Sequence, residues 1–163
     1  MSGVDIYKGG CTCRTVRYAM LSKPMFVHCC HCTWCQRETG SAFAVNALIE
    51  CHNVEVVSGA VEIIDTPSSS GKGQKIARCP QCHIALWSHY AGAGQKIHFL
   101  RVGTLDTPAL FPPDIHIFTS TKQPWVTLPE GVPAVRSYYK MEGIWPPESI
   151  ERRAALRRKV PIK

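Results

Sequence analysis

The sequence predicts a mainly β protein with a short helix near its C-terminal end. Apolar and β-branched residues gather in short runs, glycine and serine turns separate these runs, and helical signals are scarce before the last residues. The chain has 163 residues and 45% hydrophobic content, which is enough for one domain that buries roughly two-thirds of its unfolded surface.

Short segments carry the strand prediction. In residues 16–20 apolar side chains occupy every second position, which is the period of a half-buried strand. The other predicted strands are residues 43–49, 54–57, 61–64, 97–102 and 115–118. Turn residues between them lie at 9–10, 58–59 and 68–71. The serine run in the last of these is short enough for a loop tip, so it indicates no domain boundary.

A helix is predicted for residues 150–159. Two prolines and Glu148 precede it and basic residues follow at its end, an order that complements the helix dipole. A single helical turn is predicted at residues 36–38, before Thr39 and Gly40. We therefore expect a β-rich domain over residues 1–130 and a C-terminal extension with a basic helix over residues 131–163.

Seven of the nine cysteines fall into three tight clusters. The clusters are Cys11-Thr12-Cys13, Cys30-His31-Cys32-Thr33-Trp34-Cys35 and Cys79-Pro80-Gln81-Cys82. Structural zinc takes four such ligands, whereas catalytic zinc takes three and keeps one position open. The two pairs together supply four ligands for a structural site, and the triplet supplies three ligands for a catalytic site. We therefore expect two zinc ions per chain.

A disulfide framework fits the sequence less well. The start of the chain has no secretory signal, the cysteine count is odd, and disulfide-dense folds are usually shorter than about 80 residues. We expect a reduced, cytoplasmic protein without a membrane span, because no apolar segment approaches ~20 residues. A redox role for Cys79 and Cys82 is an alternative, but no βαβ pattern surrounds that pair.

The CxC and CxxC pairs are the candidates for the structural site. A zinc ion on Cys11, Cys13, Cys79 and Cys82 would join the start of the chain to its middle. Such binding contributes folding free energy on the order of 10 kcal/mol in small zinc peptides. The alternative is two unrelated pairs of buried cysteines.

The triplet Cys30, Cys32 and Cys35 predicts different chemistry. Three thiolates on Zn²⁺ leave a net charge of −1, so the site should take a soft fourth ligand such as a small-molecule thiolate. In the alternative, another side chain closes the site and makes it structural; the candidates are Cys29, Cys51, His28, His31 and His116. Strand alternation would aim Cys29 away from the metal, and His31 would need a sharp backbone turn.

Flanking residues supply candidates for substrate binding and acid–base chemistry. Arg37 could clamp a carboxylate, Thr39 and Gly40 could contact the substrate, and Trp125 could form a pocket wall. His116 could act as a general acid or base. The alternatives are an exposed helix arginine, a strand histidine bonded to backbone and a core tryptophan.

The net charge of +7 does not by itself indicate a nucleic-acid partner. Residues 151–163 carry +5 of it, so the rest of the chain carries only +2. A basic tail of this kind is more typical of a solvated helix end than of a nucleic-acid footprint. The sequence leaves the oligomeric state open.

The three clusters in this order resemble the family of glutathione-dependent formaldehyde-activating enzymes. The resemblance includes Gly9-Gly10 before the clusters and residues 103–108, 113–118 and 124–125 after them. This family shares its domain with centromere protein V, and the resemblance runs from about Lys8 to Pro129. It implies an Mss4-like fold of small antiparallel sheets with zinc knuckles. It also implies a structural zinc on the paired clusters and a second zinc on the triplet, where glutathione is proposed to bind and add formaldehyde. One departure is His83, which stands where the family usually has glycine.

The leading functional hypothesis is therefore a carbon–sulfur lyase-type enzyme acting on a thiol–aldehyde adduct such as S-hydroxymethylglutathione. The alternative from another class is a non-catalytic zinc-binding module whose surface binds a macromolecule. A third hypothesis is a degenerate enzyme in which only the structural zinc is bound. Cys29 and Cys51 are interpreted as buried, inert thiols.

Overall fold

The computed structural model describes residues 5–158. The strands in this part of the chain are β1 (Tyr7–Gly10), β2 (Arg17–Met20), β3 (Phe26–Cys30), β4 (Ala44–Glu50), β5 (Val54–Ser58), β6 (Glu62–Thr66), β7 (Gln74–Arg78), β8 (Ala85–Tyr90), β9 (Ile97–Arg101) and β10 (Ile115–Ile117). The α-helices described are α1 (Thr33–Thr39) and α2 (Pro147–Arg158), and short 3-10 turns occupy several of the connections.

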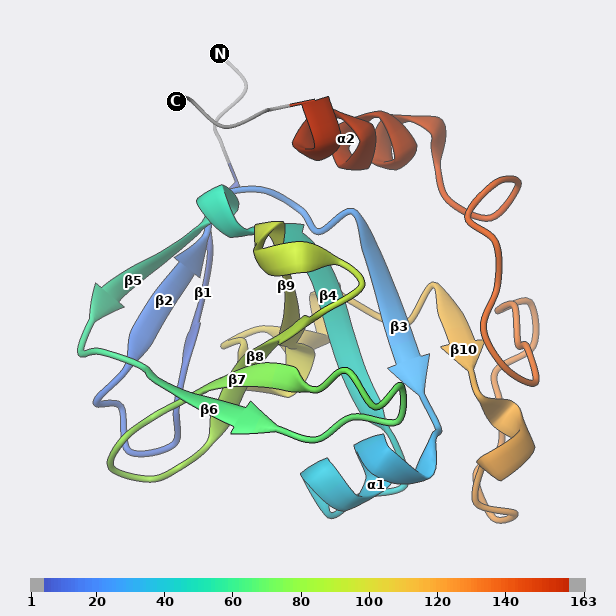
Figure 1. The fold of residues 1–163 in the computed structure, drawn as a ribbon, viewed down its shortest axis with the longest axis horizontal. Helices are drawn as coiled ribbons and strands as arrows, with labels where there is room; N and C mark the ends of the chain where they lie inside the picture. Colours follow the sequence, from blue (N-terminus) through green and yellow to red (C-terminus); the bar gives the residue numbers. More distant parts are fainter. Residues whose placement is uncertain (1–4, 159–163) are drawn as a thin grey trace.

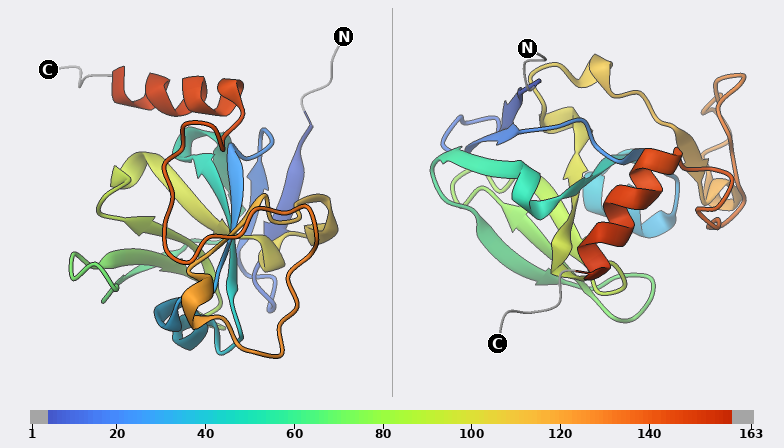
Figure 2. Two further views of the ribbon diagram at one scale, coloured as in Figure 1. Left: turned by 90° about the vertical axis from the view of Figure 1, so that its right-hand side faces the viewer. Right: turned by 90° about the horizontal axis from the view of Figure 1, so that it is seen from above.

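The strands form two sheets. One has the order β1-β2-β5, and the other has the order β10-β3-β4-β9-β8-β7-β6. Neighbouring strands are antiparallel except β10 and β3, which pair in parallel with Ile117 beside Cys30. Figure 1 shows α1 and α2 at opposite ends of β3, and Figure 2 shows α2 lying across one end of the larger sheet.

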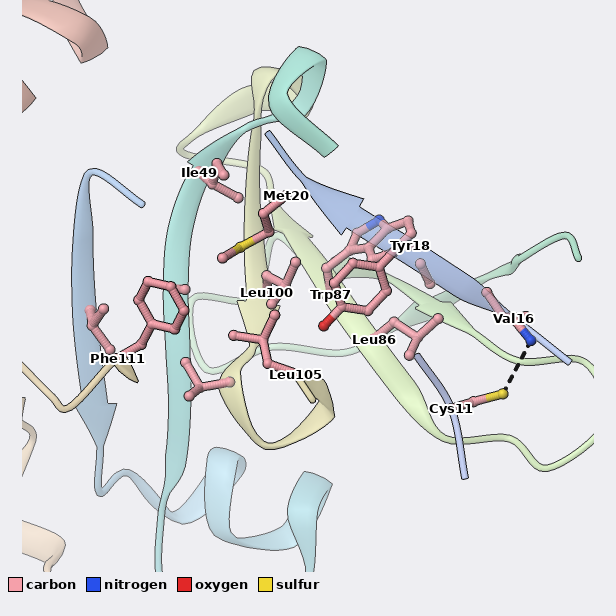
Figure 3. Close-up of a cluster of buried hydrophobic side chains, with 14 of the residues drawn as sticks. Cys11, Val16, Tyr18, Met20, Ile49, Leu86, Trp87, Leu100, Leu105 and Phe111 are labelled. Carbon is pink, nitrogen blue, oxygen red and sulfur yellow. Dashed lines mark hydrogen bonds between the residues drawn. The ribbon is translucent and has the colours of Figure 1, made fainter. Parts of the chain in front are cut away.

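Two groups of buried side chains fill the interior. The first lies between the two sheets around Tyr18, Trp87 and Leu100, and it includes Cys11, whose sulfur accepts a hydrogen bond from the backbone N–H of Val16 at 3.3 Å (Figure 3). The second group lies against the far side of the larger sheet, where Phe26 stacks on Trp145 with ring centroids 5.1 Å apart. The two metal-cluster candidates belong to different groups, because Cys30 and Cys35 lie in the second.

The segment after residue 130 packs onto the larger sheet. Ser149 donates a hydrogen bond to the carbonyl of Met25 at 2.6 Å, and Arg152 forms an ion pair with Glu50 at 2.6 Å. Trp145 and Leu156 are both buried in the second core group. Within the described residues, no helix has the length and apolar character needed to cross a membrane.

The predicted mainly β fold with a C-terminal helix is confirmed. The predictions at 16–20, 43–49, 54–57, 61–64, 97–102 and 115–118 correspond to β2, β4, β5, β6, β9 and β10. Strand β3 was missed because all five of its residues are buried, so its sequence shows no alternation. Strands β1, β7 and β8 were also missed. Helix α2 starts three residues earlier than predicted, and Lys159 lies outside the described residues.

Candidate metal centres and an adjoining cavity

The paired cysteine clusters meet in space. The four sulfurs of Cys11, Cys13, Cys79 and Cys82 all lie within 4.8 Å of one another. Cys13 lies 3.5 Å from Cys11 and 3.7 Å from Cys79, sulfur to sulfur. A tetrahedron with zinc–sulfur bonds of about 2.3 Å has edges of about 3.8 Å, so the donor set fits a structural zinc ion.

In each of the two paired cysteine clusters, the chain turns at a residue with a left-handed backbone conformation. Arg14 has φ of 64° and His83 has φ of 60°. Their backbone N–H groups donate to the carbonyls of Cys11 at 3.1 Å and Cys79 at 2.9 Å, which closes each turn. His83 therefore adopts the conformation that glycine would favour, and the knuckle keeps its shape despite the side chain.

The triplet forms at the junction of β3 and α1. Cys30 is the last residue of β3, Cys32 caps the N-terminus of α1, and Cys35 lies in the first turn of that helix. The helix begins at Thr33, earlier than the predicted turn, because the sulfur of Cys32 accepts a hydrogen bond from the backbone N–H of Cys35 at 3.3 Å. The three sulfurs lie within 4.8 Å of one another.

The three thiols of the triplet shift one another's pKa values. Hydrogen bonds from the thiols of Cys30 and then Cys35 lower the pKa of Cys32 to about 2. The same contacts and burial raise the pKa of Cys30. A site that already favours one thiolate, with two further sulfurs facing it, suits a divalent thiophilic ion that displaces the remaining protons.

A buried cation lies behind the triplet. The guanidinium of Arg101, in β9, donates hydrogen bonds to the side-chain oxygens of Asn46 and Ser88. None of the described carboxylates pairs with Arg101, which is only 7% exposed. Arg101 lines a small recess with Cys32 and Cys35. Glu38 also lines this recess but forms an ion pair with Arg78, so thiolates of the triplet would be the anionic partner left for Arg101.

A cavity of about 420 Å³ opens beside the triplet. The residues that line it are His28, Cys30, Cys32, Cys35, Asn46, Leu48, Ser68, Ser69, Ser70, Lys72, Tyr90, Gly92, Ala93, Ile97, Phe99, Ile117, Phe118, Tyr138 and Arg153. A larger, more open hollow of about 970 Å³ shares Tyr90 and Lys72 with it, but none of the three thiols lines that hollow. We assign the chemistry to the smaller cavity because it contains the sulfurs.

His28 lines the cavity as a neutral side chain. Its Nε2 lies 2.6 Å from the Tyr139 hydroxyl, and burial lowers its pKa to about 3. His28 therefore does not close the triplet, since its Nε2 is engaged elsewhere. Among residues 5–158, no fourth Cys, His, Asp or Glu joins the group of three sulfurs.

His116 lies on the opposite face of the larger sheet from the triplet. Its Nδ1 is 2.9 Å from Nε2 of His31, and both histidines group with Cys29. The parallel register places His116 beside Cys29 and Ile117 beside Cys30, so alternation turns His116 away from the cavity. The expectation that His116 acts beside the triplet is therefore corrected, and Cys29 and His31 point away from the triplet as expected.

The other predicted substrate contacts also lie outside the cavity. Arg37 is exposed on α1, and the Thr39 hydroxyl donates to the carbonyl of Cys35 at 2.8 Å. Gly40 ends α1 in a left-handed conformation with φ of 62°. Trp125 is 73% exposed. None of these four lines the cavity, because α1 presents only its first turn to it.

The two cysteines without an expected role differ in burial. Cys29 is buried, and burial raises its pKa to about 12. Cys51 is only half-buried, so the expectation of a buried thiol is wrong for it. Its sulfur groups with the ring nitrogens of His89 and His98.

A sequence model of the family described as glutathione-dependent formaldehyde-activating enzyme, GFA, matches residues 6–121. The chain belongs to this family. The match includes all seven clustered cysteines and ends before α2. A crystal structure of a Rhodobacter sphaeroides protein is similar over 61% of this GFA chain and 87% of that chain, with 20% sequence identity and a TM-score of 0.45.

Sequence reasoning missed several residues of the GFA cavity. Tyr90 ends β8, Tyr138 precedes α2, and Arg153 lies within α2. Arg153 had been included in a solvated basic tail, and nothing in its local sequence indicates that it reaches a site formed by residues 30–35. Ser68, Ser69 and Ser70 lie at a loop tip as expected, but that tip closes over the cavity.

Proposed function

We propose that this GFA protein is a zinc-dependent enzyme of the carbon–sulfur lyase type. It would form or break the adduct of formaldehyde with glutathione or a similar thiol. The observation that carries the proposal is the convergence of three thiols on the wall of a cavity of about 420 Å³. Cavities of roughly 300–1,000 Å³ are typical of small-molecule sites.

Two zinc ions per chain are part of the proposal. Cys11, Cys13, Cys79 and Cys82 would hold a structural ion, and the triplet would hold the second. At the triplet a zinc ion would supply an open coordination position and lower the pKa of a thiol placed beside it. Arg101 would stabilise the excess negative charge of this thiolate-rich site from behind.

Adduct formation is the addition of the thiol to the aldehyde carbonyl. In adduct formation the thiol sulfur bonds to the aldehyde carbon, the π electrons of the carbonyl move onto its oxygen, and that oxygen takes up a proton. The proton lost by the thiol balances the one gained, so neither oxidant nor reductant is needed. The reverse reaction releases the thiol and formaldehyde.

Tyr90 is the cavity side chain that we propose for donating that proton. It lines the cavity, and burial, then the charge of Cys35, raise the pKa of its phenol, so the hydroxyl stays protonated. His28 is held neutral by burial, and its Nε2 is occupied by Tyr139. Tyr90 would therefore act as general acid, with solvent restoring its proton.

Exchange NMR of glutathione with formaldehyde tests this function. The zinc-loaded wild-type protein should accelerate interconversion of free thiol and adduct above the spontaneous rate, and Cys35→Ser should abolish the acceleration. Cys51→Ser is the matched control, because Cys51 lies outside the triplet, and it should keep the wild-type rate. A wild-type protein with two bound zinc ions and no acceleration would contradict the proposal.

A further inference from the structure

Arg153 brings a positive charge into the cavity from outside the part of the chain that matches the family. The match ends at residue 121, whereas Arg153 lies in α2. Arg153 nevertheless lines the same cavity as Cys30, Cys32 and Cys35.

The Arg153 side chain is held in place without a carboxylate partner. Its guanidinium lies 5.6 Å from the centre of the Trp145 ring and donates to the sulfur of Met141. Trp145 is itself fixed, because its indole N–H donates to the Tyr139 hydroxyl at 2.6 Å. None of the ion pairs among residues 5–158 includes Arg153. An oriented guanidinium without an acidic partner is suited to bind a carboxylate.

A second cation and several hydroxyls line the cavity from another segment. Lys72 lies on the loop between β6 and β7, close to the serines at 68–70. In the described part of the chain, Lys72 also forms no ion pair with a carboxylate. Among residues 5–158, no Asp or Glu lines the cavity, and Lys72 and Arg153 are its lysine and arginine side chains.

The two ends of the cavity are separated along β3. Figure 1 shows α1, which begins beside the thiols, and α2, which carries Arg153, at opposite ends of this strand. Helix α2 is anchored beside Met25, and Cys30 lies five residues further along an extended chain that rises about 3.3 Å per residue. Arg153 and the three sulfurs therefore approach the cavity from different elements, the guanidinium from α2 and the sulfurs from the junction of β3 and α1.

We propose that Arg153 and Lys72 form a carboxylate-binding subsite that selects extended, anionic thiols. The inference deepens the proposed function and rests on it, since the thiol end of the ligand must lie at the triplet. The ligand class is a thiol of short-peptide length with a carboxylate remote from its sulfur. A competing interpretation gives Arg153 only a structural role, in fastening α2 to Trp145.

Thiol binding to the cobalt-substituted protein separates these interpretations. The probes are glutathione, its diethyl ester, in which both carboxylates are masked, and N-acetylcysteine, whose carboxylate lies close to its sulfur. Cobalt–thiolate absorption reports binding of each. The variants are Arg153→Gln and Lys72→Gln, with Arg158→Gln as control, since it makes the same change on an exposed part of α2 away from the cavity.

The wild-type protein and Arg158→Gln should bind glutathione about tenfold or more tightly than its diethyl ester. Arg153→Gln should remove most of this preference by weakening glutathione alone, and Lys72→Gln should remove part of it. Binding of N-acetylcysteine should be the same in all four proteins. Lys72 is exposed, so the Lys72→Gln protein should fold normally. If Arg153→Gln is unstable, Lys72→Gln still tests the subsite.

Two negative results have different meanings. If no thiol perturbs the cobalt spectrum of the wild-type protein, the proposed function itself fails. If thiols bind but the wild-type protein shows no preference for glutathione over its ester, or if both cavity variants keep that preference, the subsite is overturned while the function stands. A structural role for Arg153 predicts loss of thermal stability with the preference unchanged.

Discussion

The Tyr139 hydroxyl lies 2.6 Å from Nε2 of His28 and 2.6 Å from the indole nitrogen of Trp145. An indole N–H can only donate, so the hydroxyl accepts from Trp145, whereas in its hydrogen bond with His28 either group can be the donor. This chain of hydrogen bonds joins the segment before α2 to the strand that carries Cys30.

Replacing Tyr139 by phenylalanine should destabilise the protein by about 1–3 kcal/mol, because it leaves Nε2 of the buried His28 without its hydrogen-bond partner. Urea unfolding measures the loss. Tyr138→Phe is the control, since the Tyr138 hydroxyl has no hydrogen bond within residues 5–158 and 53% of the residue is exposed. Equal stabilities of the two variants would contradict the hydrogen-bond chain.

His116→Gln should leave adduct exchange close to the wild-type rate, because His116 faces Cys29 and not the cavity. Removal of a general acid usually costs about 100-fold or more in rate. Tyr90→Phe should show a loss of that order in the same NMR assay. A large loss in His116→Gln, with zinc content and melting temperature unchanged, would contradict this placement.

Arg101→Met should weaken metal binding at the triplet on the order of tenfold, because an anionic site loses the cation that faces it. Competition with a chromophoric chelator measures the two zinc affinities in one titration. The four-cysteine site is the internal control and should keep its affinity. Equal weakening at both sites would indicate general unfolding instead of a local charge effect.

His83→Gly should raise the free energy of unfolding by up to about 1 kcal/mol, since the left-handed backbone costs non-glycine residues about that much. Urea denaturation of the zinc-loaded protein provides the measurement. His52→Gly is the matched control: His52 is exposed and has no positive φ, so glycine there should be neutral or destabilising. Stabilisation by both substitutions would remove the conformational explanation.

Acidification should destabilise the fold in part through His98. Burial, then the nearby His89, lower the pKa of His98 to about 3. The unfolded chain, with a histidine pKa near 6.5, binds more protons between these values, so stability falls as the pH drops from about 6.5 toward 3, by up to about 1.4 kcal/mol per unit. His98→Gln should show a shallower fall between pH 7 and 5. Parallel curves for the two proteins would contradict this contribution.

The residues that could be located from sequence are those whose geometry is local. A CxC or CxxC spacing places two sulfurs on one turn, so the grouping of the cysteines follows from a few neighbouring residues. The face on which His116 lies depends on its parallel pairing with Cys29, which is a long-range register that no local pattern contains. The position of Arg153 is still harder to predict from sequence, because this residue reaches the cavity only through the packing of α2 against Met25 and Glu50.

Adjacent cysteines of β3 face opposite sides of the sheet, with Cys30 in the triplet and Cys29 beside two histidines. A shift of one residue in the pairing of β3 would exchange these two sulfurs and move His28 and His31 to the wrong faces. This strand should therefore tolerate no insertion or deletion. In related chains, length changes should be confined to the loops around it, such as the one between β6 and β7.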